Sequence, residues 1–318
     1  MSLSNEKEVP ASLSAEPRPS WLNDRLYPFQ SRYLKIDGNR VHYVDEGKGS
    51  TLLFLHSGPA WSFIYRNFII GLRDRFRCVA LDYPGFGLST AREDYGYSLA
   101  EHSEIVEKFI QRLDLSEVTM MVHDAGGPIG LGVAVRRPEL FKALILTDTF
   151  GWALSNHNPS VARMLRFVSG PVFGFFNQTF NLLPWIVATF AARRRKLSKA
   201  ERAAYTKAFP TRASRRRIQT LFRDLYVQED YMRDVEQGLK QHLKDLPVLL
   251  MYGENDAAVQ AGFMSRFEEI FPRHRSVLIE GEQHFPHEGA PEEMVAAIKD
   301  WWSADTVSAA RSSSRSRS

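Results

Sequence analysis

The sequence predicts an α/β fold, with a mostly parallel central sheet, helices on both faces and an inserted helical cap. Two observations predict it. Short apolar runs of strand length alternate with helix-length segments in the first half of the chain. This alternation then stops between Thr147 and Pro247, and two further strand-like runs follow. At 318 residues the chain is long enough to bury a large core without disulfide or metal support.

The predicted sheet strands are apolar runs rich in β-branched or aromatic residues. They are TLLFLH from Thr51, RCVAL from Arg77, VTMMVH from Val118, ALILT from Ala143, PVLLMY from Pro247 and RSVLIE from Arg275. Such continuous runs are typical of strands covered on both faces. Residues 99–113 carry apolar side chains at helical spacing and predict one of the intervening helices. Residues 32–46 alternate around Asp37, Gly38 and Asn39, which predicts an antiparallel edge hairpin.

Both ends of the chain are too polar to pack into a core. The predicted divisions are a disordered N-terminal segment at 1–20, a first core segment at 21–147, a helical cap at 148–245, a second core segment at 246–303 and a disordered Ser/Arg tail at 304–318.

One stretch of the predicted cap, residues 167–192, carries no charged side chain and is long enough to cross a bilayer. Gly170, Pro171 and Pro184 interrupt it, which favours two short apolar helices packed over a core or cleft. Contact of the cap with a membrane surface is the alternative interpretation, with interfacial docking favoured over a spanning helix.

Charge and cysteine content exclude several classes of protein. The net charge is +4, from 41 Lys and Arg against 37 Asp and Glu, so no nucleic-acid partner is expected. The basic clusters at 193–196 and 212–217 are interpreted as solvated surface. Cys78 is the single cysteine, which rules out an intramolecular disulfide, and no zinc-ligand pattern is present. The N-terminus lacks a secretory pattern, so a cytoplasmic protein is expected.

The chemistry is expected where the third buried strand ends, in the sequence VHDAGGPIG. A strand, a sharp turn rich in small residues and a helix form the nucleophile elbow that esterases build around a serine. Here its central residue is Asp124. The competing interpretation is a helix-capping carboxylate.

Two later residues decide between these interpretations. Asp256 follows the next-to-last predicted strand and His284 follows the last one, in the order nucleophile, acid, histidine. Strand ends in an open α/β sheet converge on one crevice, so Asp124, Asp256 and His284 are predicted to form a catalytic triad. Asp148 remains an alternative acid and His287 an alternative base, whereas His123 is expected to be structural.

The backbone N–H groups of Gly58 and Ala125 are the predicted oxyanion hole. Gly58 lies in a loop directly after the first buried strand, and Ala125 follows the nucleophile.

The sequence resembles the α/β-hydrolase superfamily and, within it, the haloalkane dehalogenases and related enzymes with an aspartate nucleophile, including epoxide hydrolases. The motifs that carry the resemblance are PAWSFIYR from Pro59, DYPGFGLS from Asp82, VHDAGG from Val122, KLSKAERAAYTKAFP from Lys196 and GEQHFPHE from Gly281. The dehalogenases hold halide with a Trp after the nucleophile and an Asn in the preceding loop. Ala125 and Gly58 stand at these positions. The expected substitutes and pocket residues are Trp61, Trp152, Trp185 and Tyr205.

A carboxylate nucleophile implies attack on a saturated carbon that bears a leaving group, because the product is a stable alkyl ester. His284 would then activate water to hydrolyse that ester. The expected partners are a small apolar organic substrate and water, with no metal and no organic cofactor. The alternatives are an epoxide hydrolase, with Tyr205, Tyr226 or Tyr231 as the acid, a β-lactone-cleaving enzyme, and a non-catalytic binding or membrane-peripheral protein.

Overall fold

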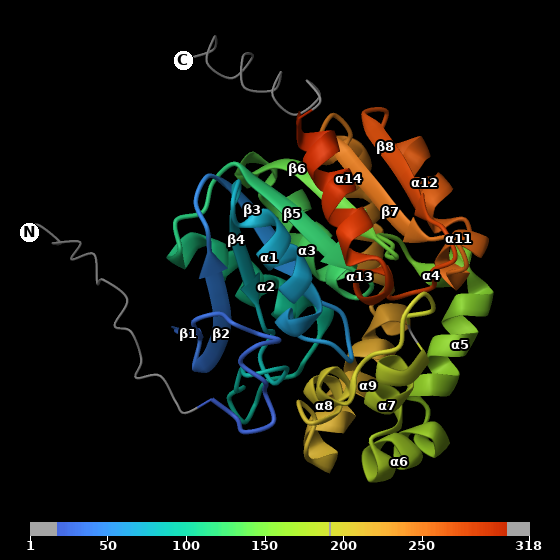
Figure 1. Cartoon of the computed structure of the whole chain (residues 1–318). Helices are drawn as coiled ribbons and strands as arrows, with labels where there is room; N and C mark the ends of the chain where they lie inside the picture. The colour runs from blue at the N-terminus through green and yellow to red at the C-terminus, as the bar shows by residue number, and fades with distance from the viewer. Residues whose placement is uncertain (1–17, 191, 304–318) are drawn as a thin grey trace, which may run out of the picture.

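The structure is a computed structural model that describes residues 18–190 and 192–303 (Figure 1). The predicted tail at 304–318 and residues 1–17 of the predicted N-terminal segment lie outside the described residues.

Within the described residues, one eight-stranded sheet has the order β1-β2-β4-β3-β5-β6-β7-β8. Its strands are β1 (Arg32–Ile36), β2 (Asn39–Glu46), β3 (Ser50–Leu55), β4 (Phe76–Leu81), β5 (Val118–His123), β6 (Phe141–Thr147), β7 (Val248–Gly253) and β8 (His274–Ile279). The pairs β1–β2 and β2–β4 are antiparallel, and the remaining pairs are parallel. Asp37 and Gly38 have φ angles of 49° and 79° in the β1–β2 turn, as a tight hairpin requires.

The predicted strands are present, but the burial of the last one differs from the prediction. Strands β3, β5, β6 and β7 are almost wholly buried, as their continuous apolar runs predict. Strand β8 is the edge of the sheet, and most of its residues are exposed. The prediction of burial on both faces was wrong for β8, because a strand at a sheet edge has no neighbour on one side.

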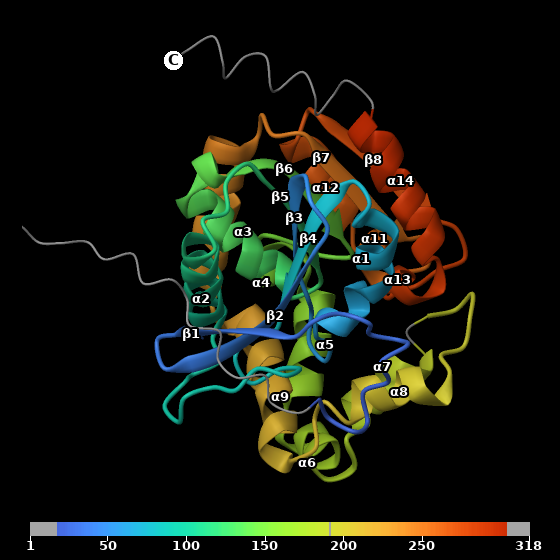
Figure 2. The same ribbon diagram turned by 60° about the vertical axis from the view of Figure 1, so that its left-hand side comes forward.

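Helices cover both faces of the sheet (Figure 2). On one face α1 (Arg66–Leu72) packs against α14 (Pro291–Ser303), and on the other α2 (Leu99–Arg112) packs against α3 (Gly126–Arg136). The shorter elements of this part are η1 (Ser62–Tyr65), η2 (Pro138–Leu140), α11 (Ala257–Gln260), α12 (Phe263–Ile270) and α13 (Pro286–Gly289).

Between β6 and β7 the chain is helical. The elements are α4 (Leu154–His157), α5 (Pro159–Ser169), α6 (Pro171–Phe180), α7 (Leu182–Phe190), α8 (Lys199–Thr206), α9 (Arg212–Val227), α10 (Glu229–Gly238) and η3 (Leu239–Leu243). Helices α5 to α9 lie beyond the carboxyl ends of the strands, whereas α10 and η3 pack on α3 (Figure 1). The end of the predicted cap segment therefore lies against the core.

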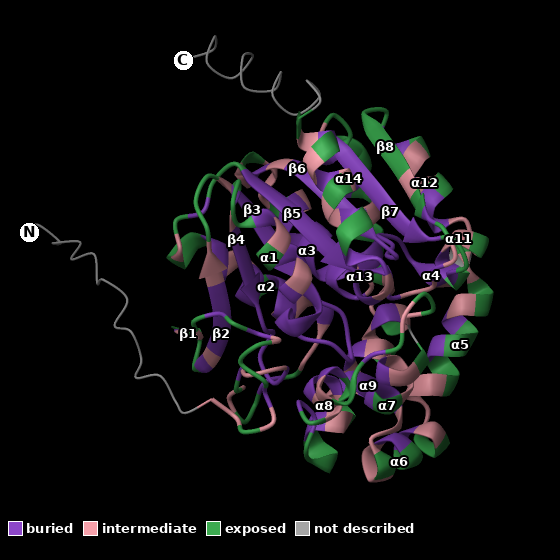
Figure 3. Cartoon of the chain, viewed as in Figure 1, coloured by how far each residue is buried: buried purple, intermediate pink, exposed green. Residues whose placement is uncertain are grey.

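The uncharged run at 167–192 breaks at Gly170 and at Asn181, whose φ of 57° is left-handed. The two short helices expected there correspond to α6 and α7. Their predicted burial was wrong for many side chains, since Phe175, Phe180 and Phe190 are 58–67% exposed. Figure 3 shows intermediate and exposed residues along α6 and α7. Among the described residues no helix is both long and apolar enough to cross a membrane.

The basic clusters are less solvated than expected. The Arg215 guanidinium donates to the carbonyl groups of Gln178 and Phe209, and that of Arg217 donates to the carbonyl of Gly85. Arg195 belongs to a buried ionic cluster described below. These arginines tie loops and helices together instead of facing water alone.

Candidate active site

Asp124 lies on a sharp turn between β5 and α3, with a left-handed φ of 47°. Its backbone carbonyl accepts hydrogen bonds from the Gly127 amide at 2.9 Å and the Thr149 hydroxyl at 2.6 Å. Small residues are required beside it, because a Cβ on Gly126 would lie 2.4 Å from the Leu55 carbonyl oxygen. The motif VHDAGG therefore produces a strained turn that presents the Asp124 side chain above the sheet.

The structure brings Asp124, His284 and Asp256 together. The His284 Nε2 lies 3.7 Å from the Asp124 Oδ1, and the His284 Nδ1 lies 3.0 Å from the Asp256 Oδ2. Asp124 follows β5, Asp256 follows β7 and His284 follows β8, so neighbouring carboxyl ends of parallel strands supply the three groups. The side chain of His284 is 37% exposed, whereas that of Asp256 is 6% exposed.

The two carboxylates control the charge of His284. Burial lowers the pKa of the His284 imidazole, but Asp256 and Asp124 outweigh burial and raise that pKa well above its usual value. Burial raises the pKa of Asp256, yet the charge and hydrogen bond of His284 lower it to about 2. Asp256 is therefore an ionised partner that orients the imidazole.

Asp148, the alternative acid, lies beside Asp256. Its Oδ1 accepts a hydrogen bond from the Gly253 amide at 2.9 Å, and its side chain is buried. Burial and the Asp256 charge raise the pKa of Asp148 well above its usual value. The Asp148 Oδ2 is buried and has no hydrogen-bond partner among the described residues. A proton on Asp148 would be shared with Asp256, and this interaction lowers the pKa of Asp256. We interpret the pair as holding one proton, with the negative charge on Asp256 beside His284.

Replacing Asp148 with Asn tests this assignment. The Asn amide would keep both hydrogen bonds, accepting from Gly253 and donating to Asp256, so we expect Asp148→Asn to retain kcat within about threefold. Asp148→Ala, which loses both bonds, is the matched variant and should reduce turnover further. A loss of about a hundredfold or more in Asp148→Asn would make Asp148 the acid. The measurement is steady-state kinetics at matched pH.

Asp148, Asp256 and His284 offer ligand atoms within 4.8 Å of one another, a spacing that a cation could bridge. A cation there would displace the proton of Asp148 and break the hydrogen bond between Asp256 and His284. We therefore interpret the cluster as a proton-sharing network that positions the imidazole.

Histidines near the site hold its loops. The His56 Nε2 accepts from the Tyr83 amide at 3.1 Å, so its Nδ1 carries the proton and donates to the Ser57 carbonyl at 2.8 Å. His123 donates from Nε2 to the His284 carbonyl at 2.8 Å. These bonds fix the loop before Gly58 and the loop that carries His284.

His287, the alternative base, is buried away from solvent. Its Nε2 lies 3.2 Å from the Thr147 hydroxyl, and its ring packs against Tyr65 and Phe68. Burial lowers the pKa of His287 to about 3. The structure therefore gives His287 a packing role.

Three of the four expected pocket residues have their polar atoms engaged elsewhere. The Trp61 indole donates to the Ala204 carbonyl at 3.0 Å, and the Trp152 indole donates to Asn158 at 3.2 Å. The Tyr205 hydroxyl donates to Glu288 at 2.6 Å. Each of these donors is therefore already satisfied, and a role of the three side chains in the substrate pocket stays a prediction. Trp185 is 49% exposed and lines a groove between α7 and α8.

Apolar residues missed in the sequence analysis lie over the predicted oxyanion hole. Leu221, Phe222 and Phe86 have side-chain atoms 3.1–3.8 Å from the position that a Cβ on Gly58 would occupy. Leu221 and Phe222 belong to α9, so the cap supplies an apolar wall above Gly58. Ala125, the other predicted donor, is the N-cap residue of α3, where helix amides lack intrahelical acceptors.

A buried ionic cluster was also missed. Arg66 from α1 pairs with Glu288 from α13, and lies 2.7 Å from Glu201 of α8. Arg195 lies 2.7 Å from Glu288 and 2.9 Å from Glu201. The cluster joins the cap to the segment just after His284. Its members are far apart in sequence, so no local pattern indicates it.

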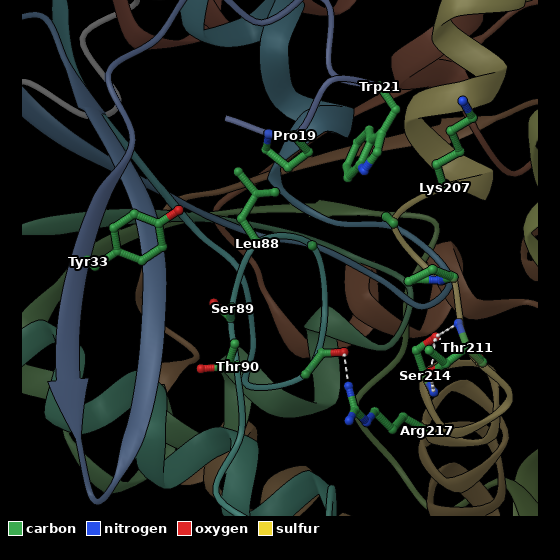
Figure 4. Close-up of a pocket in the computed structure, with 14 residues that line it drawn as sticks. Pro19, Trp21, Tyr33, Leu88, Ser89, Thr90, Lys207, Thr211, Ser214 and Arg217 are labelled. Carbon is green, nitrogen blue, oxygen red and sulfur yellow. Dashed lines mark hydrogen bonds between the residues drawn. The ribbon is translucent and has the colours of Figure 1, made fainter. Parts of the chain in front are cut away.

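A surface pocket of about 380 Å³ lies elsewhere, between the N-terminal segment, residues 85–90 and the start of α9 (Figure 4). Its lining includes Trp21, Leu88, Lys207 and Arg217. The Arg217 guanidinium donates a hydrogen bond to the Gly85 carbonyl at one side of the pocket. No member of the Asp124 cluster contributes to this pocket.

Comparison with known proteins identifies the family. Residues 50–291 match a family model described as alpha/beta hydrolase fold. The chain is 34% identical over 280 residues to haloalkane dehalogenase 2 of Mycobacterium bovis, covering 86% of this chain and 95% of that protein. It is 30% identical over 285 residues to a cis-3-alkyl-4-alkyloxetan-2-one decarboxylase of Shewanella oneidensis, covering 87% of this chain and 89% of that protein.

The crystal structure of haloalkane dehalogenase DbeA from Bradyrhizobium elkani USDA94 has the same fold. Its TM-score is 0.80 at 23% sequence identity, with 89% of this chain and 99% of that chain covered. The chain therefore belongs to the α/β-hydrolase family and is a haloalkane dehalogenase-like hydrolase.

Proposed function

We propose that the protein hydrolyses a small apolar organic substrate through an alkyl ester formed on Asp124. The observation that carries the proposal is the line of contacts from Asp124 through His284 to Asp256, with distances of 3.7 and 3.0 Å. The apolar wall of Leu221, Phe222 and Phe86 supports an apolar substrate.

In the first step a carboxylate oxygen of Asp124 attacks a saturated carbon. The new carbon–oxygen bond forms as the bond to the leaving group breaks, and the electron pair departs with that group. The Asp124 carboxylate loses its negative charge when it is alkylated, and the product is an ester of the Asp124 side chain. Protonated His284 does not block this step, because the attacking group is the carboxylate.

In the second step water attacks the carboxyl carbon of the Asp124 ester. Alkylation removes the Asp124 charge that helps to keep His284 protonated, so His284 releases its proton to solvent. The neutral imidazole then takes a proton from the attacking water, and ionised Asp256 stabilises the resulting imidazolium. The tetrahedral oxyanion would face the N–H groups of Gly58 and Ala125. Collapse releases the alcohol, which takes the proton back from His284. The Asp124 carboxyl group then loses the remaining proton of the water to solvent, which regenerates the carboxylate.

The leaving group separates two substrate classes. A departing halide needs N–H donors that stabilise its negative charge. In this sequence Ala125 and Gly58 stand where the dehalogenases carry Trp and Asn. The Trp61 and Trp152 indoles are engaged elsewhere. This observation favours a second candidate, a β-lactone, because an oxetan-2-one ring is the substrate class in the name of the Shewanella relative.

For a β-lactone, Asp124 would attack the saturated ring carbon that is bonded to the ring oxygen, and not the carbonyl carbon. That carbon–oxygen bond breaks and the leaving carboxylate stays on the same molecule, so no separate halide site is needed. Hydrolysis of the ester then gives a β-hydroxy acid. Alternatively, loss of carbon dioxide forms an alkene while the Asp124 carboxylate departs.

Epoxide opening is the less supported alternative. Protonation of the epoxide oxygen needs an available acid, and the cap tyrosines are engaged: Tyr205 bonds to Glu288, Tyr226 lies 3.2 Å from Ser169 and Tyr231 donates to the Pro128 carbonyl.

The test is the intact mass of His284→Ala after incubation with a haloalkane, an epoxide and a β-lactone, because loss of the base traps the ester. A haloalkane adds its mass less that of the hydrogen halide, whereas an epoxide or a lactone adds its whole mass. Peptide mapping should place the adduct on Asp124. Headspace analysis detects an alkene if the lactone ester decarboxylates.

Two controls accompany it. The exposed His242 is the matched histidine, so His242→Ala should turn over substrate without an adduct. The double variant Asp124→Asn/His284→Ala should remain unmodified. The absence of both adduct and alkene with every substrate class would contradict the proposal and favour a non-catalytic binding protein.

A further inference from the structure

The tip of the cap exposes an unusual number of aromatic side chains. They are Phe167, Phe175, Phe176, Phe180, Trp185 and Phe190, and each is 46–69% exposed. At about 200 Å² for each aromatic side chain, these fractions amount to roughly 700 Å² of accessible surface. That area exceeds the largest apolar patch of an ordinary monomeric protein. Helices α5, α6 and α7 carry these residues, and Figure 1 shows them below the sheet, with α6 at the bottom of the view and β8 at its top.

These aromatic residues are not isolated. Ring centroids of Phe167 and Phe173, of Phe176 and Phe180, and of Trp185 and Phe190 lie 5.6–6.3 Å apart. The first pair joins α5 to α6, the second lies within α6 and the third within α7. Figure 3 shows intermediate and exposed residues along all three helices. We call α5, α6 and α7 together the aromatic tip.

The charged residues in the segment that carries the aromatic tip have one sign. From Thr149 to Ala200 the sequence contains seven Lys and Arg and no Asp or Glu. Arg194 pairs with Glu293, and Arg195 lies in the buried cluster. Arg163, Arg193 and Lys196 are exposed and have no acidic partner among the described residues. An apolar surface that is accompanied by such unpaired cations is complementary to an anionic lipid surface.

A groove of about 430 Å³ between α7 and α8 adjoins this surface. Trp185 and Ala188 form its apolar wall, while Lys199 and Arg202 supply two cationic groups, and Thr189 and Thr206 also line it. Such a groove can take an anionic headgroup while the neighbouring rings enter the boundary between headgroups and acyl chains.

A second copy of this chain fits the surface less well. A twofold contact through the aromatic tip would oppose the same unpaired cations, and the segment has no acidic residue to pair with them. Repulsion between like charges disfavours that arrangement, whereas an anionic bilayer attracts it.

We propose that the aromatic tip docks on an anionic phospholipid surface, with a headgroup in the groove between α7 and α8. Docking holds the enzyme at the bilayer, where apolar substrates of the kind assigned to the Asp124 site accumulate. The docking itself is independent of the proposed reaction.

The experiment is cosedimentation of the full chain with vesicles of phosphatidylcholine alone and with phosphatidylglycerol added. We expect binding to the anionic vesicles that weakens as salt is raised, because exposed charges are screened. Phe175→Ser/Phe180→Ser should weaken binding at least about tenfold through loss of apolar burial. Arg163→Glu/Lys199→Glu should also weaken vesicle binding at least about tenfold, because it replaces two cationic side chains with anionic ones that the lipid headgroups repel.

Matched substitutions on β8, far from the aromatic tip, serve as controls. Leu278 is 48% exposed and Arg275 is exposed, so Leu278→Ser and Arg275→Glu should leave vesicle binding unchanged. Circular dichroism of each variant verifies the fold.

Three outcomes would overturn the proposal. The first is that the protein binds neither kind of vesicle. The second is that the β8 control variants lose as much vesicle binding as the variants of the aromatic tip. The third is that sedimentation velocity shows a dimer, which Phe175→Ser/Phe180→Ser dissociates. Because binding is measured without substrate, failure here is distinguishable from failure of the Asp124 mechanism.

Discussion

Asp124→Asn is expected to abolish turnover, with kcat reduced by at least about 10,000-fold. The neutral amide cannot displace a leaving group from a saturated carbon, so no ester forms. The substitution preserves the shape of the side chain and the backbone bonds to Gly127 and Thr149. The measurement is product formation under saturating substrate, together with the melting temperature.

Asp124→Ala is the companion variant, because the His284-activated water could slowly hydrolyse the Asn amide back to Asp124. Glu254, a partly exposed neighbour of Asp256 in sequence, provides the control: its carboxylate accepts from the Gly281 amide, and Glu254→Gln should keep nearly full activity. Turnover by Asp124→Ala close to that of the unmodified protein would remove Asp124 from the mechanism.

Arg66→Met is expected to lower the free energy of unfolding by about 3–5 kcal/mol. Arg66 is almost fully buried, and its guanidinium pairs with both Glu288 and Glu201. Removing it leaves buried carboxylates with one fewer cation, and Arg195 is only partly able to compensate because it is 33% exposed. Urea unfolding at neutral pH measures the change.

Arg233→Met is the matched control for that experiment. Arg233 pairs with Glu229 in α10, but the two side chains are 50% and 37% exposed, so the expected change is within about 0.5 kcal/mol. The double variant Arg66→Met/Glu288→Leu should recover part of the loss, because it removes a buried carboxylate that has lost one of its two cationic partners. A loss in Arg66→Met no larger than in Arg233→Met would show that the cluster does not stabilise the fold.

Local sequence was sufficient for the elements that carry the site. Several buried strands are continuous apolar runs that lead to residues predicted for the site: Gly58 in the loop after β3, Asp124 directly after β5, and Asp256 in the turn after β7. The glycines after Asp124 mark the sharp turn, because larger residues would collide with Leu55 and Thr149. The burial of β8 was mispredicted, since an apolar run does not reveal whether a strand lies at the edge.

The leaving-group residues could not be assigned in the same way. Trp61, Trp152 and Tyr205 have suitable donors, but each donor finds a partner distant in sequence or across a turn. The apolar wall formed by Leu221 and Phe222 depends on how α9 lies over the loop that contains Gly58, which no periodicity in α9 reveals.

The sequence by itself determined the α/β fold, the order of the strands along the chain, and the placement of Asp124, Asp256 and His284 at strand ends. These features follow from local hydrophobic patterns and turn chemistry. Only the tertiary structure decided that Asp148 is buried beside Asp256, that Arg66 joins the cap to the His284 segment, and that the aromatic tip is exposed. Those properties depend on burial and on contacts between residues far apart in sequence, which short-range patterns do not encode.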